Sequence, residues 1–180
     1  LGALANGWRG LNDDQQWAAD YFFMLGGTPL AGSDLDIVRQ TLQLTANGLN
    51  GATLNLKLTV NGSALGYVNK HDSRFGLMEK LREKTGTTKK SWTPNYDVRG
   101  KTHVLTRRGD IHLDTSALDK SAEFGALVLI HEATHKFAGT ADFSYIYEDT
   151  LEYENPMDKA KCLNNADSYA YFVYMAASAG

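Results

Sequence analysis

The chain has 180 residues, of which 43% are hydrophobic and 22% are charged, and its formal net charge at pH 7 is −3. This size and composition predict a single domain over residues 1–180, and the scattered Lys and Arg residues argue against nucleic acid as the main partner. No apolar run is long enough to span a membrane, and the single cysteine, Cys162, excludes an internal disulfide.

Residues 1–100 are expected to form a scaffold of helices and strands. Two helices are predicted near the start, because in each a capping residue precedes apolar residues at helical spacing. One spans residues 12–25 and is capped by Asn12. The other spans residues 33–47 and is ended by Gly48.

Residues 52–60 alternate apolar and polar side chains, which predicts a half-buried strand with its leucines on the buried face. Asn61-Gly62 is a turn signal, so residues 64–68 are expected to return as the second strand of a hairpin. The next predicted elements are a short helix, a long polar loop and two strands: residues 75–84, 84–99, 102–106 and 110–113.

The most informative motif is the pentad His131-Glu132-Ala133-Thr134-His135. A helix places residues i and i+4 on one face, so both imidazoles can reach one metal ion, and Glu132 lies near the same edge. These residue types at this spacing are typical of a zinc hydrolase, in which the glutamate acts on a metal-activated water. Two histidines and a glutamate at the end of a buried helix need partners, and a metal ion is one.

The helix that carries the pentad is predicted from the residues before and after it. Residues 124–130 are apolar on every side, which is typical of a helix buried in a core. Its start is expected between Ser116 and Ser121, which can cap free amides, and Lys136 and Gly139 mark its end.

A catalytic zinc site needs a third protein ligand and one open position. Asp142 lies seven residues past His135 and directly follows the Gly139-Thr140 turn, so its carboxylate can fold back under the histidines. Glu152 and Glu154 are alternatives further along the chain. Spacing and turn chemistry favour Asp142.

Two segments extend the pentad into a longer pattern. The first reads Gly139-Thr140-Ala141-Asp142-Phe143-Ser144-Tyr145, and the second reads Asn165-Ala166-Asp167-Ser168-Tyr169-Ala170-Tyr171-Phe172. They resemble the G-T-x-D-x-x-Y-G and N-A-D-x-Y-x-Y-F blocks of the aspzincin metallopeptidases, the family of deuterolysin and the peptidyl-Lys metalloendopeptidases. The resemblance covers roughly residues 100–175, and it departs from the family at Ile146, where a glycine is usual.

The resemblance implies an α+β, zincin-like metallopeptidase domain with a small sheet and a buried active-site helix. It implies one catalytic Zn²⁺ held by His131, His135 and Asp142, with Glu132 as general base and Tyr145 as a donor to the oxyanion. The expected activity is that of a zinc-dependent endopeptidase acting on a protein or peptide substrate. By the same analogy the protein is expected to be secreted or delivered outside the producing cell.

The metal-site half, residues 101–180, is expected to end in a helix that begins at Asn155-Pro156. Asp167 falls on the apolar face of this helix, four residues after Leu163. One hypothesis is that Asp167 accepts a hydrogen bond from the outer N–H of a zinc-bound histidine. The alternative is a helix-surface carboxylate that pairs with Lys161 or with water.

The strand before the metal helix, over residues 110–114, is expected to be a sheet edge that pairs with an extended substrate. His112 or Asp114 is then a candidate to face the substrate. Two other functions remain open for the chain. One is a non-catalytic binding module on the same fold, which Ile146 favours, and the other is the peptidase toxin domain of a larger secreted bacterial effector.

Overall fold

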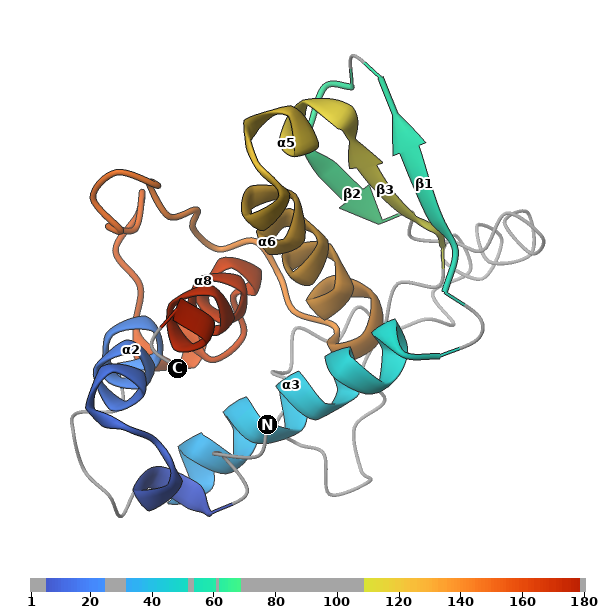
Figure 1. The fold of residues 1–180 in the computed structure, drawn as a ribbon. Coiled ribbons are helices and arrows are strands. Elements are labelled where there is room, and N and C mark those ends of the chain that lie inside the picture. Colours follow the sequence, from blue (N-terminus) through green and yellow to red (C-terminus); the bar gives the residue numbers. More distant parts are fainter. Residues whose placement is uncertain (1–5, 25–31, 52–53, 61, 69–108, 179–180) are drawn as a thin grey trace, which may run out of the picture.

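The structure is a computed structural model that describes residues 6–24, 32–51, 54–60, 62–68 and 109–178. Within these ranges the chain combines helices with one three-stranded sheet, which confirms the predicted α+β class (Figure 1). The elements predicted over residues 75–84, 84–99 and 102–106 lie outside the described residues. None of the described helices is long and apolar enough to cross a lipid bilayer.

The two N-terminal helices lie where the sequence predicts helices. A short 3-10 turn, η1 (Gly7–Gly10), leads into α2 (Asp13–Phe23). Asn12 and Gln15 form reciprocal capping hydrogen bonds at the start of α2, each side chain accepting from the backbone N–H of the other. The second helix, α3 (Gly32–Leu49), extends two residues beyond its predicted end.

Gly48 does not end α3, so this prediction is wrong. The helix continues through Gly48 to Leu49, and the missing side chain leaves room for the ring of Phe137, which a Cβ at this position would overlap. The glycine therefore serves a close approach between α3 and the segment that follows the pentad, rather than a helix end.

The sheet consists of β1 (Leu56–Thr59), β2 (Gly66–Val68) and β3 (Ile111–Asp114), with β3 in the centre. β1 pairs with β3 in parallel and β2 pairs with β3 antiparallel, so the predicted hairpin is wrong. The link between β1 and β2 crosses the end of β3, where the Asp114 carboxylate accepts a hydrogen bond from the backbone N–H of Gly62 at 2.7 Å. β3, a strand far along the chain, therefore lies beside β1 in the position that the prediction gave to residues 64–68.

The apolar side of β1 is exposed, so the buried face predicted for residues 52–60 is also wrong. Leu56 is 43% exposed and Leu58 is 59% exposed. The pentad helix, α6 (Ala122–Ala133), packs against β2 and β3, and β1 lies at the far edge of the sheet (Figure 1). Alternation of side chains identifies a strand, but the position of the strand in the sheet decides which face is covered.

Two helices replace the single one predicted to begin between residues 116 and 121. Asp114 caps α5 (Thr115–Lys120), and Ser121 caps α6 by accepting a hydrogen bond from the backbone N–H of Phe124 at 3.0 Å. The extended backbone of Ser121 separates the two helices. Both α5 and α6 therefore begin at residues whose side chains satisfy free amides.

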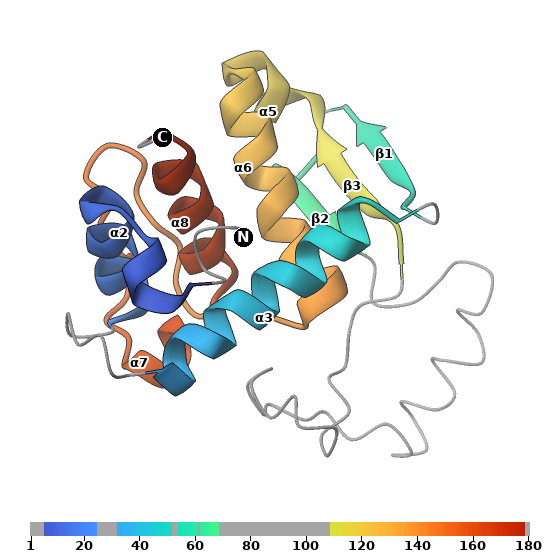
Figure 2. The same cartoon turned by 60° about the horizontal axis from the view of Figure 1, so that its bottom comes forward.

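α6 lies between the sheet and α8 (Ala166–Ser178), as Figures 1 and 2 show. Leu127 joins the largest cluster of buried side chains, which includes residues of α2, α3 and α8. Val128 and Ala133 join two smaller clusters on the side of the sheet. A helix with apolar residues on several faces thus packs on several sides, as its sequence predicts.

The terminal helix begins later than predicted. A short helix, α7 (Lys159–Cys162), is capped by the Asp158 side chain, and α8 begins only at Ala166. Asn155-Pro156 is not a helix start, so that prediction is wrong. α8 packs beside α2, which brings the C-terminal segment against the N-terminal helices (Figure 1).

Candidate metal centre

The H-E-x-x-H pentad straddles the end of α6. His131 and Glu132 lie in the last turn of α6, and His135 lies in η2 (Thr134–Ala138), a π-helical turn. Gly139 then ends the helix with a left-handed φ of 70°. The Nε2 atoms of the two histidines are 3.1 Å apart, so both imidazoles point to the same place.

Asp142 completes a group of three possible metal ligands. Its Oδ1 atom lies 2.9 Å from Nε2 of His135 and 3.1 Å from Nε2 of His131. The three ligand atoms lie 2.9 to 3.1 Å from one another, a spacing that fits one zinc ion with ligand distances of about 2 Å. The alternative ligands Glu152 and Glu154 are both exposed and lie outside this group.

Each imidazole is held through its outer nitrogen. The Asp167 Oδ1 atom lies 2.5 Å from Nδ1 of His131, and the carbonyl oxygen of Thr140 lies 2.8 Å from Nδ1 of His135. Both partners are acceptors, so in the neutral form of each ring, which is the form that binds a metal ion, Nδ1 carries the proton and Nε2 keeps a lone pair. Asp167 is 5% exposed and points into the centre rather than to the helix surface. The chemistry of these donors fits Zn²⁺.

Carboxylates flank His131 on both sides and set its charge. Burial by itself lowers the pKa of His131, but hydrogen bonds to Asp142 and Asp167 outweigh burial and raise the pKa to about 10. Burial raises the pKa of Asp142, while hydrogen bonds from His131 and His135 lower it well below its usual range. The centre therefore favours a positive charge between its carboxylates, which is the charge that a metal cation brings.

Glu132 lies between the metal centre and the sheet. It is 5% exposed, and its Oε1 atom is 3.9 Å from Nε2 of His131. Strand β2 limits its position, because a Cβ added at Gly66 would lie 2.9 Å from Cγ and 3.2 Å from Oε1 of Glu132. Sequence patterns did not identify Gly66 as a residue that contacts the site, because no local signal predicts that β2 approaches α6 so closely.

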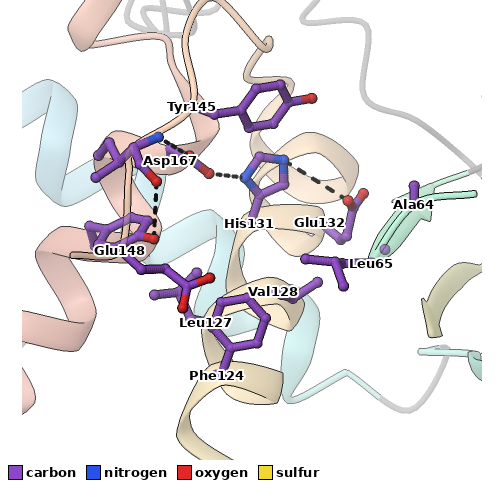
Figure 3. A pocket seen from close by; sticks show the side chains of 13 residues that line it. Ala64, Leu65, Phe124, Leu127, Val128, His131, Glu132, Tyr145, Glu148 and Asp167 are labelled. Atoms are coloured by element: carbon purple, nitrogen blue, oxygen red, sulfur yellow. Dashed lines mark hydrogen bonds and ion pairs between the residues drawn. The ribbon is translucent and has the colours of Figure 1, made fainter. Parts of the chain in front are cut away.

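Tyr145 stacks on the ring of His131, with ring centroids 6.1 Å apart and an interplanar angle of 14° (Figure 3). It is 54% exposed, so its phenol is accessible beside the centre. The next residue, Ile146, donates its backbone N–H to Oδ2 of Asp167 at 2.8 Å and accepts a hydrogen bond from Tyr171. The φ angle of Ile146 is not positive, so the backbone at this position does not require the glycine usual in the family.

Asn165 fixes the loop between Asp142 and Tyr145, a role that sequence reasoning did not assign. The fully buried Asn165 side chain accepts hydrogen bonds from the backbone N–H groups of Phe143 and Ser144, and it donates one to the carbonyl of Ser144. In the sequence, the only hint of this role is an amide side chain directly before an apolar helix. The hydrogen-bond partners of that amide are set by the tertiary structure.

β3 is not the sheet edge that was expected to pair with substrate, because it lies between β1 and β2. His112 stacks on Tyr67 with ring centroids 4.3 Å apart, and Asp114 is 2% exposed and caps α5. The prediction that this strand forms the substrate edge is therefore wrong. The strand that closely approaches Glu132 at Gly66 is β2.

A pocket of about 380 Å³ opens beside the centre (Figure 3). His131, Glu132, Tyr145 and Asp167 line it, so the pocket is continuous with the proposed metal site. Its walls also include residues of α6, of the link before β2, of the loop after Tyr145 and of α8: Leu65, Phe124, Leu127, Val128, Glu148 and Tyr171.

A comparison with protein families matches residues 80–174 to a family described as lysine-specific metallo-endopeptidase, of the aspzincin type. The match covers more than half of the chain and includes the pentad, Asp142, Tyr145 and Asp167. Searches among curated proteins and among solved structures found no match. The family match confirms the resemblance carried by the two motifs: the chain belongs to the aspzincin family of zinc metallopeptidases.

Proposed function

We propose that the chain is a zinc-dependent endopeptidase with a single zincin-like domain over residues 1–180. The observation that supports this most directly is the convergence of His131, His135 and Asp142, with both outer imidazole nitrogens already held. Membership of the family supports a protein or peptide as substrate. Action outside the producing cell is part of the proposal and rests on family analogy alone.

The proposed roles follow from where each side chain lies. When bound, Zn²⁺ supplies the positive charge that makes a water molecule more acidic and polarises the scissile carbonyl. Glu132 accepts the proton of the attacking water and returns it to the leaving amine. Tyr145 donates its phenol hydrogen to the oxyanion that develops on the carbonyl oxygen. Asp167 and Thr140 keep the two imidazoles in their orientation.

Ile146 was the main support for a non-catalytic binding module, and its surroundings do not favour that alternative. Its N–H holds Asp167, and its φ angle is open to any residue. A toxin domain of a larger bacterial effector would use the same chemistry as the proposed peptidase. The experiment that tests the peptidase therefore covers both.

Mass-spectrometric mapping of cuts in a diverse peptide mixture tests the proposal, with bound zinc measured in parallel by elemental analysis. The zinc-loaded protein is expected to cut the peptides. Glu132→Ala should retain zinc and lose about 10²- to 10⁴-fold in rate, because it removes the general base. Asp142→Ala should lose both zinc and activity, because it removes a ligand.

Glu154→Ala is the matched control, since Glu154 is an exposed acidic residue outside the group of ligands, and it should keep both properties. Zinc retained by Asp142→Ala and lost by Glu154→Ala would assign the third ligand to Glu154. A protein that holds zinc and makes no Glu132-dependent cut would contradict the peptidase proposal in favour of the binding module.

A further inference from the structure

The pocket beside the metal centre has an apolar floor. Leu127 and Val128 are 8% and 7% exposed and precede His131 by about one turn of α6. Phe124 continues the lining by another turn, and Leu65 adds an apolar side chain from the link before β2 (Figure 3). A substrate side chain that enters this pocket next to the metal centre therefore meets mainly apolar surface.

The carboxylates that line the pocket already have partners. Asp167 uses Oδ1 for His131 and Oδ2 for the backbone N–H of Ile146. Glu148 forms an ion pair with Lys120, whose Nζ atom lies 2.8 Å from Oε1 of Glu148. Among the described residues, the remaining carboxylate of the pocket is that of Glu132, which is the proposed general base and acts on the attacking water.

Lys120 places a positive charge beside the pocket, against two of the residues that line it, Phe124 and Glu148. Its Nζ atom lies 4.1 Å from the centroid of the Phe124 ring, in addition to its ion pair with Glu148. Lys120 is the last residue of α5 and directly precedes Ser121, whose side chain caps α6, so the backbone of Lys120 is fixed by two helices. A substrate ammonium at this point would meet a like charge and a carboxylate that is already paired with Lys120, and it would lose hydration over the apolar floor.

We propose that this pocket accepts an apolar side chain next to the scissile bond, and that Lys120 makes the pocket reject lysine and arginine. The inference rests on the proposed peptidase function and gives this chain a site preference opposite to the lysine specificity in the description of its family. Burial of a Leu, Met or Phe side chain against Leu127, Val128 and Phe124 provides the gain in binding. Lys120 acts through Glu148, so it is a positioning residue for specificity.

The test is the ratio of cuts beside Leu, Met and Phe to cuts beside Lys and Arg in a peptide library. The zinc-loaded protein is expected to favour the apolar residues by about tenfold or more. Lys120→Ala releases Glu148 and should shift the ratio toward Lys by about tenfold. The double variant Lys120→Ala/Glu148→Gln should lose the new cuts at Lys. A general loss of stability would lower all cuts together and would leave the ratio unchanged.

Lys159→Ala is the matched control. Lys159 is about as exposed as Lys120 and pairs with a carboxylate, Asp34, at 3.0 Å. Asp34 does not line the pocket, whereas the partner of Lys120, Glu148, does. The ratio of cuts beside apolar residues to cuts beside Lys and Arg should be the same for Lys159→Ala as for the unsubstituted protein. Fluorescence anisotropy of matched Leu- and Lys-containing peptides on zinc-loaded Glu132→Ala should give the same order of preference without turnover.

Preferential cuts at Lys that disappear in Glu148→Gln would overturn the inference and leave the peptidase function standing. A complete lack of Glu132-dependent cuts would instead overturn the peptidase function. In that case the anisotropy measurement alone tests the preference of the pocket. Tighter binding of the Leu peptide than of the Lys peptide supports the inference, and equal or weaker binding of the Leu peptide overturns it.

Discussion

The carboxylate of Asp167 lies 2.5 Å from Nδ1 of His131, although the two residues are 36 positions apart in the chain. α8 thereby reaches the proposed metal centre through its packing against α6. The second oxygen of the same carboxylate accepts the backbone N–H of Ile146, directly after Tyr145. One side chain thus orients a proposed ligand and holds the loop that carries the proposed oxyanion donor.

Asp167→Asn should weaken zinc binding by about 10- to 100-fold, because the neutral amide is a poorer acceptor for the imidazole N–H than a carboxylate. Competition with a chromogenic chelator measures the zinc affinity. Asp119→Asn, on the exposed side of α5, is the matched control and should bind zinc normally. Equal zinc affinities of Asp167→Asn and the unsubstituted protein would show that His131 does not depend on this carboxylate.

Gly66→Ala should retain zinc and lose activity. The added Cβ would lie 2.9 Å from Cγ of Glu132, too close for the carboxylate to stay in place, while the three proposed ligands are untouched. A shift of about 1 Å in a catalytic group costs on the order of 100-fold in rate. The kcat of a peptide substrate and the bound zinc are measured together.

The same Cβ would also lie 2.8 Å from Cγ1 of Val128, and this second contact is an alternative cause of a loss of activity. Gly66→Ala/Val128→Ala relieves that contact and keeps the one with Glu132. The double variant should therefore remain inactive, and recovery of activity in it would assign the effect to Val128.

Gly48→Ala should destabilise the protein. In an open helix this change stabilises by roughly 0.5–1 kcal/mol, but here the new methyl group overlaps the ring of Phe137, and overpacking costs about 1–3 kcal/mol. The overpacking cost exceeds the helical stabilisation, so the free energy of unfolding should fall. Urea unfolding of the zinc-free protein measures the change in the free energy of unfolding.

Phe137→Ala provides the control background for this prediction, because it removes the ring. There, Gly48→Ala should stabilise rather than destabilise, as at an open helical position. The same destabilisation in both backgrounds would mean that the contact between Gly48 and Phe137 is not responsible.

The carboxylate of Asp114 should stabilise the fold in a pH-dependent way. Hydrogen bonds from the Ser116 hydroxyl and from the backbone N–H of Gly62 lower the pKa of Asp114. A lowered folded-state pKa contributes stability that is present above the unfolded-state pKa of about 4 and is lost as the pH falls through the folded-state value. The difference in unfolding free energy between the native protein and Asp114→Asn should therefore shrink below about pH 4. Urea unfolding between neutral and acidic pH measures it, and a constant difference would contradict the prediction.

Local sequence signals were enough to predict the segment that carries the proposed site. The spacing of His131 and His135, the helix end at Gly139 and the short turn to Asp142 all depend on neighbours within a few residues. The capping of α2 by Asn12 is local in the same way. Helix periodicity, caps and turns follow from short-range geometry, so a sequence without its fold can show them.

Strand order and the walls of the pocket were decided only by the tertiary structure. Asn61-Gly62 is a valid turn signal, yet β3 enters between β1 and β2, because strand pairing joins segments that no local pattern relates. For the same reason the sequence did not indicate that Gly66 lies against Glu132, or that Lys120 forms an ion pair with Glu148. The sequence by itself determined which residues are available for the metal site. The packing of α6 against the sheet and α8 decided which groups hold those residues in place and which side chains line the pocket, since these contacts exist only between segments brought together by folding.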